Sequence, residues 1–493
     1  MARDLILALD QGTTSTRAIA FRAPNLAPVA TARRDLAQHF PNSGWVEHEP
    51  EDLFAHSLAV LREAMAMAGA TAADVAGIGI TNQRETTLVW RRDTGQPVHR
   101  AIVWQDRRTA PACAALRTAG HEAAVTATTG LLLDPYFSAT KIAWALDHWP
   151  MLRAAGDRLC VGTIECWLLF RLTGGLHVSD ATNASRTQLM GLGSGWDQGL
   201  CDLFGVPRAA LPEIVDCAGP IGMTLPEHFG LPIAITGMAG DQQAAAIGQA
   251  CFAPGETKAT YGTGAFILTH AGPSPPVSTH RLLATVAWQL GGERRYALEG
   301  SLFVAGQMIH WLRDELGLIA SSSECAALAR SVLDSGGVQV VPGFAGLGAP
   351  HWRPEARGAI LGLTLGSGRG QIVRAALEAV ANQSAELQRA FAADGVHWSR
   401  LRIDGGMAAN DFLAQDLADL LGIAVERPAN VESSALGAAM LAAVGSGIHR
   451  SLDGAASAMR GTSAAFAPDM PSGDRAQRIE RWDRAVAAVI LAG

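Results

Sequence analysis

The stretch LILALDQGTTSTRAIAF, residues 5–21, decides the fold. Leu5 to Leu9 form a short apolar run typical of a buried strand, and Ala18 to Phe21 form a second one. Asp10 and the turn residues 11–17 lie between them, which predicts strand, tight turn, strand. Backbone N–H groups near a glycine, hydroxyls and an arginine can converge on phosphate oxygens. The stretch therefore indicates a phosphate-binding turn, with an ordinary surface hairpin as an equal alternative.

Residues 258–269, KATYGTGAFILT, repeat this plan with a glycine-threonine-glycine turn between two apolar runs. Two such turns about half a chain apart predict two related halves that face one site. We place the boundary near residues 250–255, where a Pro-Gly pair breaks the pattern. The predicted domains are 1–250 and 251–493.

Composition excludes several classes of protein. The chain has 493 residues, 48% hydrophobic and 17% charged, as expected for a globular protein of two or three domains. A net charge of −7 offers no basic face to nucleic acid. No apolar run approaches the roughly 20 residues of a membrane span, so we expect a cytoplasmic protein. The seven cysteines form no CxxC pair and are expected in the core.

The lysines are Lys141 and Lys258. Neither follows a glycine in a GxxxxGK[ST] loop, and neither lies in a VAIK-like strand. The phosphate-binding modes of P-loop proteins and of protein kinases are therefore excluded. If the chain binds ATP, glycine, threonine and arginine must hold the phosphates.

Helices and strands alternate along the chain. Apolar spacing predicts a helix over Pro50–Met65 and a strand over Val75–Ile80. A longer helix is predicted from Gln371 onward. The strand 401–404 leads into two glycines and a predicted helix Asp411–Leu421, a plausible nucleotide-binding turn. This alternation predicts an α/β chain whose ligand groups gather at strand ends.

Six motifs, in the order DQGTTSTR, GWVEHEP, TNQRETTLVW, DPYFSATK, AGDQQAA and TYGTG, resemble the sugar-kinase family over about residues 5–445. NQRET and DPYFS resemble the members that phosphorylate glycerol. The resemblance implies an α/β fold of two actin-like (ribonuclease H-like) domains flanking an ATP cleft. It places the first phosphate turn and most of the glycerol pocket in residues 1–250, and the second turn and the adenosine site in residues 251–493.

The resemblance also implies a reaction, the ATP- and Mg²⁺-dependent phosphorylation of glycerol to sn-glycerol 3-phosphate. One alternative is a kinase of the same fold that acts on another short polyol or a ketose, such as erythritol or dihydroxyacetone. The other is an actin-like ATPase without a metabolite substrate. A homo-oligomer, either a dimer or a tetramer, is expected.

Asp241, after an apolar strand and before a small-residue helix, is by its position alone more often a helix cap. The resemblance makes it the catalytic base. Arg84 and Glu85 would, by sequence alone, be a solvated surface pair. By resemblance, the glycerol hydroxyls are bound by Arg84, Glu85, Tyr136, Asp241 and Gln242, while Trp104 and Phe266 line the carbon side or belong to the core.

The resemblance assigns the nucleotide side to residues of both turns. These are Thr13, Thr14, Ser15, Arg17, Thr263, Gly306, Gly406 and Asn410. The resemblance gives Asp10 as the metal ligand, with Asp241 as a candidate to share the ion. His310 stands where the family has a glutamine. A glutamine amide offers a donor and an acceptor side by side, whereas each ring nitrogen of His offers only one or the other. A histidine packed on a helix is therefore slightly favoured over a nucleotide ligand at this position.

Residues 222–235 lack the glycine- and arginine-bearing loop through which some family members bind fructose 1,6-bisphosphate. We therefore expect regulation by this compound to be weak or absent. His228 faintly resembles a loop histidine that other members have phosphorylated, but the tyrosine expected before it is missing. An ordinary loop histidine is the favoured interpretation.

Overall fold

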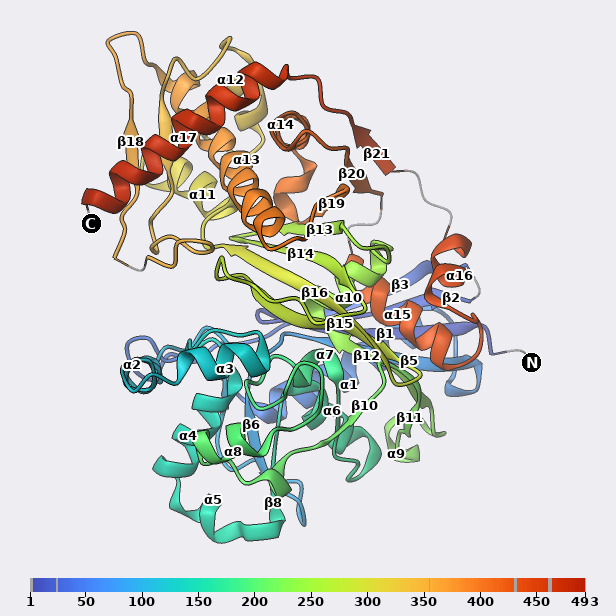
Figure 1. Ribbon diagram of the computed structural model, residues 1–493. Coiled ribbons are helices and arrows are strands. Elements are labelled where there is room, and N and C mark those ends of the chain that lie inside the picture. The colour runs from blue at the N-terminus through green and yellow to red at the C-terminus, as the bar shows by residue number, and fades with distance from the viewer. Residues whose placement is uncertain (1–2, 24, 354, 430–431, 460–462, 493) are drawn as a thin grey trace.

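The computed structural model describes residues 3–23, 25–353, 355–429, 432–459 and 463–492. Two large sheets, one from each half of the chain, organise these residues (Figure 1). The first has the strand order β11-β12-β5-β1-β2-β3 and comprises β1 (Leu5–Gln11), β2 (Ser15–Arg22), β3 (Ala27–Asp35), β5 (Val75–Asn82), β11 (Ala218–Met223) and β12 (Ala234–Gly240). The second has the order β15-β16-β14-β13-β19-β20-β21 and comprises β13 (Glu256–Tyr261), β14 (Ala265–Gly272), β15 (Leu283–Leu290), β16 (Glu293–Leu302), β19 (Arg400–Asp404), β20 (Val425–Pro428) and β21 (Ser463–Phe466).

The two sheets share one plan. In the first, β1 pairs antiparallel with β2 and β2 with β3, whereas β1, β5 and β12 run parallel. In the second, β13 pairs antiparallel with β14 and β14 with β16, whereas β13, β19 and β20 run parallel. Each of the two predicted phosphate-binding turns joins the first two strands of its sheet. The predicted α/β fold with two related halves is confirmed.

Helices cover these sheets and fill the space between them. Those of the first half are α1 (Pro50–Met67), α2 (Ala110–Thr118), α3 (Glu122–Thr129), α4 (Ser138–His148), α5 (Pro150–Ala155), α6 (Ile164–Thr173), α7 (Ala181–Ala184), α8 (Gln198–Phe204), α9 (Pro226–Phe229) and α10 (Asp241–Gly248). Those of the second are α11 (Gly306–Asp314), α12 (Glu324–Arg330), α13 (Arg369–Ala393), α14 (Asp411–Leu421), α15 (Ser433–Gly445), α16 (Leu452–Ala458) and α17 (Ser472–Ala492). In Figure 1, α11 to α14 and α17 form the upper part and α2 to α8 the lower part.

Sequence pattern explains the main elements. Helix α1 begins at a proline, has two acidic residues in its first turn, and buries Leu53, Val60 and Leu61. Helix α13 buries Val373, Leu377, Val380, Leu387 and Phe391, the stripe expected for one apolar helix face. The predicted helices over these segments and over Asp411–Leu421 are confirmed.

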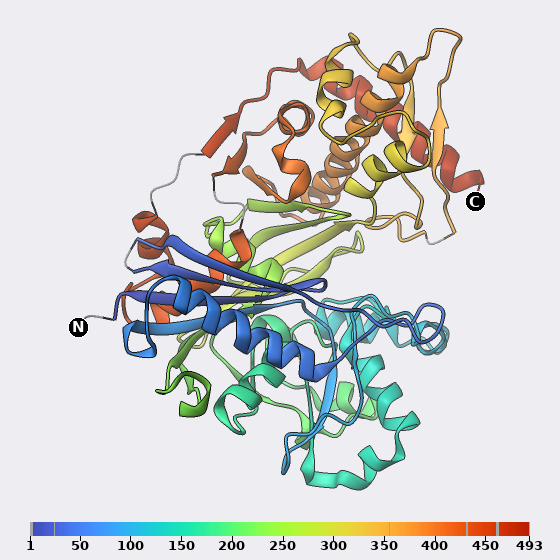
Figure 2. The same ribbon diagram turned by 180° about the vertical axis from the view of Figure 1, so that it is seen from behind.

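Strand β1 is covered on both faces because its alternate side chains belong to different cores. Leu5, Leu7 and Leu9 join the core beneath α1, and Ile6 and Ala8 join the core that contains α10 and α15. Figure 2 shows α1 lying along these strands on the side away from α15. The first sheet is therefore completed by a helix from the far end of the chain.

Helices α10 and α15 each follow the sixth strand of their sheet in chain order, β12 and β20, and pack against each other between the sheets (Figure 1). Glycines allow this close approach. A Cβ atom at Gly437 would lie 1.8 Å from the carbonyl oxygen of Ala244, and one at Gly79 would lie 2.1 Å from that of Ala438. The backbones of α15, α10 and β5 are thus in direct contact, without intervening side chains.

Two segments lie apart from the core of the first sheet, and one local prediction was wrong. Strand β6 (Leu88–Arg91) does not join the first sheet, because it pairs with β8 (Leu159–Gly162) in a separate ribbon. The stretch around His228, expected to be an ordinary loop, holds β10 (Glu213–Val215), β11 and α9. His228 accordingly lies in a short helix, buried, with Nε2 next to the carbonyl of Arg171.

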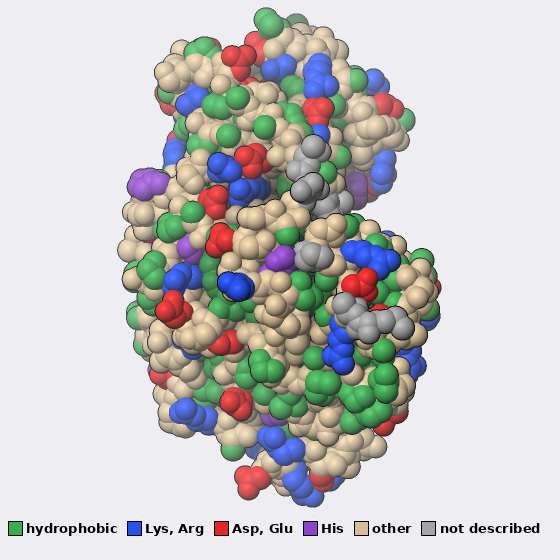
Figure 3. Space-filling view, turned by 90° about the vertical axis from the view of Figure 1, so that its right-hand side faces the viewer, with side chains coloured by type: hydrophobic (Ala, Val, Ile, Leu, Met, Phe, Trp, Pro, Cys, Tyr) green, Lys and Arg blue, Asp and Glu red, His purple; other side chains and the backbone are tan. Residues whose placement is uncertain are grey.

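Three further two-stranded ribbons join β4 (Glu47–His48) to β7 (Ala101–Ile102), β9 (Val178–Asp180) to β10, and β17 (Gln339–Val341) to β18 (Ala359–Leu361). Across the described ranges, no helix combines the length and the apolar character needed to cross a membrane. The space-filling view shows the molecular outline narrowing where the upper part meets the lower one (Figure 3).

Candidate active site

Three parallel strands deliver the predicted residues to one sheet edge. Asp10 lies near the carboxyl end of β1, and Arg84 and Glu85 follow β5. Asp241 directly follows β12 and opens α10. In register, Asp10 pairs with Thr81 of β5, so these strand ends are level with one another. The carboxyl ends of parallel strands are where α/β proteins assemble their ligand sites.

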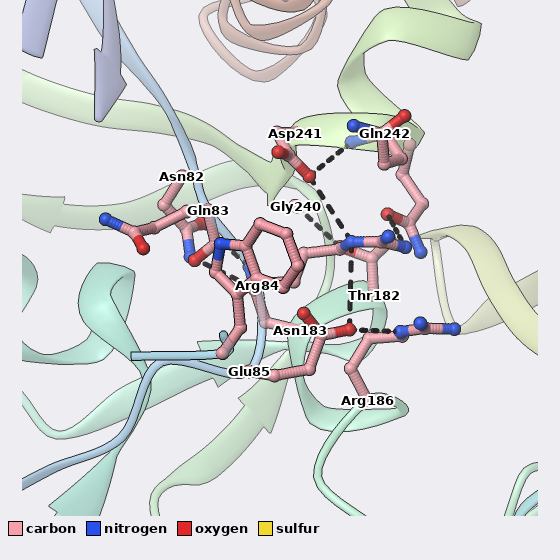
Figure 4. A network of polar contacts seen from close by, with 12 residues as sticks. Asn82, Gln83, Arg84, Glu85, Thr182, Asn183, Arg186, Gly240, Asp241 and Gln242 are labelled. Carbon is pink, nitrogen blue, oxygen red and sulfur yellow. Dashed lines mark hydrogen bonds and ion pairs between the residues drawn. The ribbon is translucent and has the colours of Figure 1, made fainter. Parts of the chain in front are cut away.

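Arg84 and Glu85 are buried, with 3% and 1% of their surface exposed, so the alternative of a solvated surface pair is wrong. Glu85 adopts a left-handed backbone conformation, with φ of 61°. Such a conformation is strained for a residue with a side chain, and strain of this kind gathers at functional sites. The carboxylate of Glu85 accepts a 2.6 Å hydrogen bond from Arg186 Nε (Figure 4).

Four side chains form a buried charge cluster, defined here as Arg84, Glu85, Arg186 and Glu299. Arg84 donates to one oxygen of Glu299 at 2.6 Å, and Arg186 donates to the other at 2.9 Å. Two positive and two negative groups therefore balance inside the protein. Burial of charge is tolerated when it is paired in this way.

The pKa values of the two glutamates move in opposite directions. Burial disfavours the Glu299 carboxylate, but Arg186 and Arg84 outweigh burial and lower the pKa of Glu299 to about 2. Burial dominates at Glu85 and raises the pKa of that carboxyl, although Arg186 and Arg84 oppose the shift. Glu299 is thus the firmly ionised member of the charge cluster.

Asp241 lies at the edge of the charge cluster, and 30% of its side chain is exposed. Its Oδ1 accepts from the backbone N–H of Gln242 at 2.7 Å and lies 3.3 Å from Arg84 Nε (Figure 4). The side chain is therefore fixed at the amino end of α10 and still open to an incoming group. An exposed carboxylate held in this way can accept a proton.

Lys258, on β13 of the second sheet, fixes the amide of Gln242. Its Nζ donates to Oε1 of Gln242 and, at 2.9 Å, to Oγ1 of Thr260. Burial lowers the pKa of Lys258, although Asp404 and Asp241 oppose the shift. Because the amide oxygen is occupied, Nε2 of Gln242 is left as a hydrogen-bond donor.

Three aromatic rings meet beside these polar groups. The ring of Trp104 lies 5.5 Å from that of Tyr136 and 6.2 Å from that of Phe266, both edge to face. Phe266 comes from β14 of the second sheet, so the rings join the two halves. Indole Nε1 of Trp104 donates to Oγ1 of Thr13 at 2.9 Å, which connects this wall to the first phosphate turn.

The first phosphate turn is closed by a 3.0 Å bond from the N–H of Gly12 to the carbonyl of Ser15. Thr14 is exposed, and Thr13 and Ser15 are half-buried. Arg17, predicted to bind phosphate, forms an ion pair with Glu432, at the start of α15. The turn therefore leaves Thr14 open to solvent, whereas the Thr13 hydroxyl and Arg17 have protein partners.

The second phosphate turn lies against two other predicted nucleotide residues. The carbonyl of Thr263 accepts from the N–H of Gln307 at 3.1 Å, and a Cβ atom at Gly306 would lie 2.6 Å from the carbonyl of Gly262. That same Cβ would lie 3.5 Å from Met407, the neighbour of Gly406. The structure thus gathers Thr263, Gly306 and Gly406.

Of the remaining two nucleotide candidates, one precedes a helix and the other lies on one. Asn410 caps α14, and its side-chain oxygen accepts from the N–H groups of Phe412 and Leu413. Its amide nitrogen remains available as a donor. His310 is exposed on α11, one turn after Gly306.

Asp10 is the candidate metal ligand. Burial and then the charge of Asp241 raise its pKa to about 6, with Arg17 opposing. Within the described part of the chain, its carboxylate has no hydrogen-bond or ion-pair partner, and no group of three or more His, Cys, Asp or Glu could hold a metal. Two neighbouring carboxylates nevertheless fit Mg²⁺, which nucleotide-dependent enzymes bind through one or two carboxylates and the substrate phosphates.

Sequence reasoning missed Arg186, Glu299 and the role of Lys258. Arg186 belongs to no recognised motif. Glu299 is the acidic residue in the otherwise uncharged run Tyr296–Leu302, and a lone charge in such a strand is a signal of a buried partner. The rarity of lysine in this chain was an equally usable signal for Lys258.

Comparisons with known proteins show the family to which the chain belongs. Sequence models of the FGGY family of carbohydrate kinases match residues 5–248 with the N-terminal domain and residues 257–446 with the C-terminal domain. The glycerol kinase of Methylobacterium nodulans is 53% identical over 497 residues, which cover 99% of this chain and 98% of that protein. Glycerol kinase 1 of Pseudomonas aeruginosa is 51% identical over 488 residues, 98% of each protein.

Solved structures show the same relationship. The crystal structure of Plasmodium falciparum glycerol kinase with ADP aligns with a TM-score of 0.93 at 35% identity and covers 98% of both chains. A ligand-bound xylulose kinase from Lactobacillus acidophilus aligns with a TM-score of 0.87 at 20% identity and thus shares the fold. The chain therefore belongs to the FGGY family of carbohydrate kinases.

Proposed function

We propose that this protein transfers the γ-phosphoryl group of ATP to glycerol and forms ADP and sn-glycerol 3-phosphate. The observation that carries the proposal is the buried charge cluster beside an aromatic wall and the half-open carboxylate of Asp241. A small triol offers hydroxyls to the charged groups and a hydrocarbon edge to the rings. The relatives named glycerol kinase, at 51–53% identity, support this acceptor.

The acceptor is bound by polar groups of the first half. Arg84 and Gln242 donate hydrogen bonds to its hydroxyl oxygens, and Glu85 accepts from a hydroxyl. The phenol of Tyr136, 3.4 Å from Arg84 Nη2, completes the polar side. Trp104 and Phe266 cover the carbon chain.

Asp241 acts as general base. The terminal hydroxyl oxygen attacks the γ-phosphorus and forms the new O–P bond, while the bond from that phosphorus to the β–γ bridging oxygen breaks. The hydroxyl proton passes to the Asp241 carboxylate, and ADP leaves with the bridging oxygen. Asp241 suits this role because its oxygens are partly exposed and its backbone is fixed at the start of α10.

The nucleotide binds between the two phosphate turns. Thr13, Thr14 and Ser15 hold its phosphates from the first half and Thr263 from the second, and Arg17 reaches them if it leaves Glu432. Gly306, Gly406 and Asn410 border the adenosine, and His310 lies on the same helix as Gly306. Asp10, together with Asp241, would hold Mg²⁺, which offsets phosphate charge when it is bound.

Three coarser features complete the proposal. The chain divides into domains near residues 250–255, a division supported by the position of the two large sheets on either side of that segment. The enzyme works in the cytoplasm. It forms a homo-oligomer, and light scattering of the purified protein would measure the mass of that oligomer.

An acceptor series tests the function. ADP release should be fastest with glycerol and much slower with dihydroxyacetone, erythritol or xylulose. It should be slowest with 1,2-propanediol, because a missing hydroxyl leaves buried polar groups unpaired, and such discrimination reaches ~10⁴-fold. If another polyol or ketose is turned over faster than glycerol, that compound is the acceptor. If the rate of ATP hydrolysis does not change with any acceptor, a non-metabolic ATPase is favoured.

The variant Asp241→Asn tests the mechanism within the same assay. Its single-turnover rate with glycerol should fall by ~10²–10⁴-fold, because the side chain keeps its size and loses its basicity. Calorimetry should still detect glycerol binding. A rate near that of the wild type would show that another group takes the proton.

A further inference from the structure

The arginine proposed to bind the acceptor is held from behind by a side chain of the other half. Glu299 lies on β16 of the second sheet, and 1% of its side chain is exposed. One of its oxygens accepts from Arg84 at 2.6 Å and the other accepts from Arg186 at 2.9 Å. Both carboxylate oxygens are therefore used, one for each arginine.

Strand register explains how Glu299 reaches these arginines. On β16 it pairs with Leu268 of β14, and Leu268 pairs with Lys258 of β13. Residues that pair across strands share one face of a sheet. Glu299 and Lys258 therefore project from the same face of the second sheet, and each contacts a proposed acceptor ligand of the first half, namely Arg84 or Gln242.

Charge balance makes Glu299 indispensable to this arrangement. Glu85 already accepts from Arg186 at 2.6 Å and lies 3.9 Å from Arg84. Without the Glu299 carboxylate, two buried guanidinium groups would face the single charge of Glu85. The loss of one partner from a buried ion pair leaves an uncompensated charge, which the remaining groups must rearrange to satisfy.

That rearrangement would act on the proposed base. The guanidinium of Arg84 lies near five side chains. These are Glu299 at 2.6 Å, Asp241 at 3.3 Å, the Tyr136 hydroxyl and the Gln243 amide oxygen at 3.4 Å each, and Glu85 at 3.9 Å. The contact with Glu299 is the shortest, so it sets where the guanidinium lies. Released from Glu299, Arg84 would close on Asp241, and both would be lost to the acceptor.

We propose that Glu299 is a positioning residue for the acceptor, which holds Arg84 and Arg186 from the second half and keeps Arg84 from pairing fully with Asp241. This inference rests on the proposed function, since Arg84 and Asp241 are the acceptor ligand and the base. Glu299 itself lies behind the arginines and does not touch the acceptor. Through it, the second sheet shapes a pocket whose polar ligands belong to the first half.

The test is the substitution Glu299→Gln, which keeps the size of the side chain and removes its charge. The KM for glycerol should rise at least 10-fold, because a neutral amide holds the charged guanidinium groups of Arg84 and Arg186 less tightly than a carboxylate does. The KM for ATP should stay within about twofold of the wild-type value. The matched control is Glu378→Gln. Glu378 is a buried carboxylate of the same half, 2.7 Å from Arg374, and lies on α13 outside the site. It should leave both KM values unchanged.

A second variant separates positioning from folding. Glu299→Asp keeps the charge on a shorter side chain, so its KM for glycerol should fall between those of the wild type and Glu299→Gln. If Glu299→Gln does not fold, the split between the two KM values is read from Glu299→Asp alone. Equal changes in both KM values, or none in a folded variant, would overturn the proposal.

The wild-type assay is run first, so that the two proposals can fail separately. If the wild type turns over a different acceptor, the proposed function fails, and the KM comparison is then made with that acceptor. If the wild type phosphorylates glycerol and the KM values do not split, the role of Glu299 fails alone.

Discussion

Among single residues, Asp10 is a buried carboxylate whose charged form is disfavoured by its surroundings. Burial and the charge of Asp241 raise its pKa from the ordinary 3.8 to about 6, while Arg17 opposes the shift. The folded protein thus binds this proton more tightly than the unfolded chain does. Stability contributed by the protonated form is present below pH 4 and is lost as the pH rises to about 6. Above that pH, the Asp10 carboxylate destabilises the fold.

Replacing Asp10 by Asn should therefore raise the melting temperature at pH 8 in the absence of Mg²⁺, by an amount on the order of 2 °C. The same comparison at pH 5 should give a smaller difference, because wild-type Asp10 is then largely protonated. Added Mg²⁺ should stabilise the wild type more than the variant. Scanning calorimetry measures all three, and a gain of equal size at both pH values would contradict the pKa assignment.

Site residues that belong to a recognised motif could be predicted from the sequence. Residues outside the motifs that hold those site residues in place could not. Arg84 and Asp241 carry recognisable neighbours, but alone each had a commoner surface or capping interpretation. Arg186 lies in unremarkable sequence, and the lone charge of Glu299 in an apolar strand indicates a buried partner without identifying it. Their importance arises from tertiary contacts across the two halves. Which groups form these ion pairs is a property of the assembled fold, so no local pattern identifies the partners.

Among the elements, the crossing of α10 and α15 depends on residues without side chains. A Cβ at Gly437 would lie 1.8 Å from the carbonyl oxygen of Ala244, and backbone atoms cannot move aside as a flexible side chain would. Gly437→Ala should lower stability by ~3 kcal/mol or more, at the upper end of typical overpacking costs. Thermal unfolding measures the loss.

The control for this variant is Gly195→Ala. Around Gly195, nothing lies within 4 Å of an added Cβ, and its φ is not in the left-handed region. This change should alter stability by no more than about 0.5 kcal/mol. A Gly437→Ala variant as stable as this control would mean that the two helices can separate without loss.

Whether a segment forms a helix or a strand was easier to predict than which other element it pairs with or packs against. Apolar periodicity predicted α1, α13 and α14, and the hairpin of β1 and β2, because burial of one face imposes that period. It did not predict that β6 pairs with β8, nor that α15 packs on the first sheet. Pairing depends on which surfaces meet in space. The period of apolar residues along a segment indicates only that one face of that segment is buried.

At the scale of the whole molecule, the first sheet should not be stable without the second half of the chain. The face formed by Ile6, Ala8, Ile19 and Phe21 packs in one core with α15. A fragment of residues 1–250 should therefore expose apolar surface, bind the dye ANS and aggregate. Co-expression with residues 251–493 should restore a soluble, active pair.

A fusion separates the contribution of α15 from that of the whole second half. Residues 1–250 joined through a flexible linker to residues 432–446 should bind less dye than residues 1–250 alone, because the helix covers the open face. A fragment 1–250 that is already monomeric and melts cooperatively would contradict this dependence.

The position of α15 also sets the order of events during synthesis. A ribosome makes β1 long before it makes the helix that covers the second face of β1, because that helix begins at residue 433. Part of the core of the nascent first half therefore stays open to water until the chain up to α15 has been translated. Chaperones that bind apolar segments would meet that face throughout this interval. The N-terminal half reaches its final packing at nearly the same time as the C-terminal half, although it is made first.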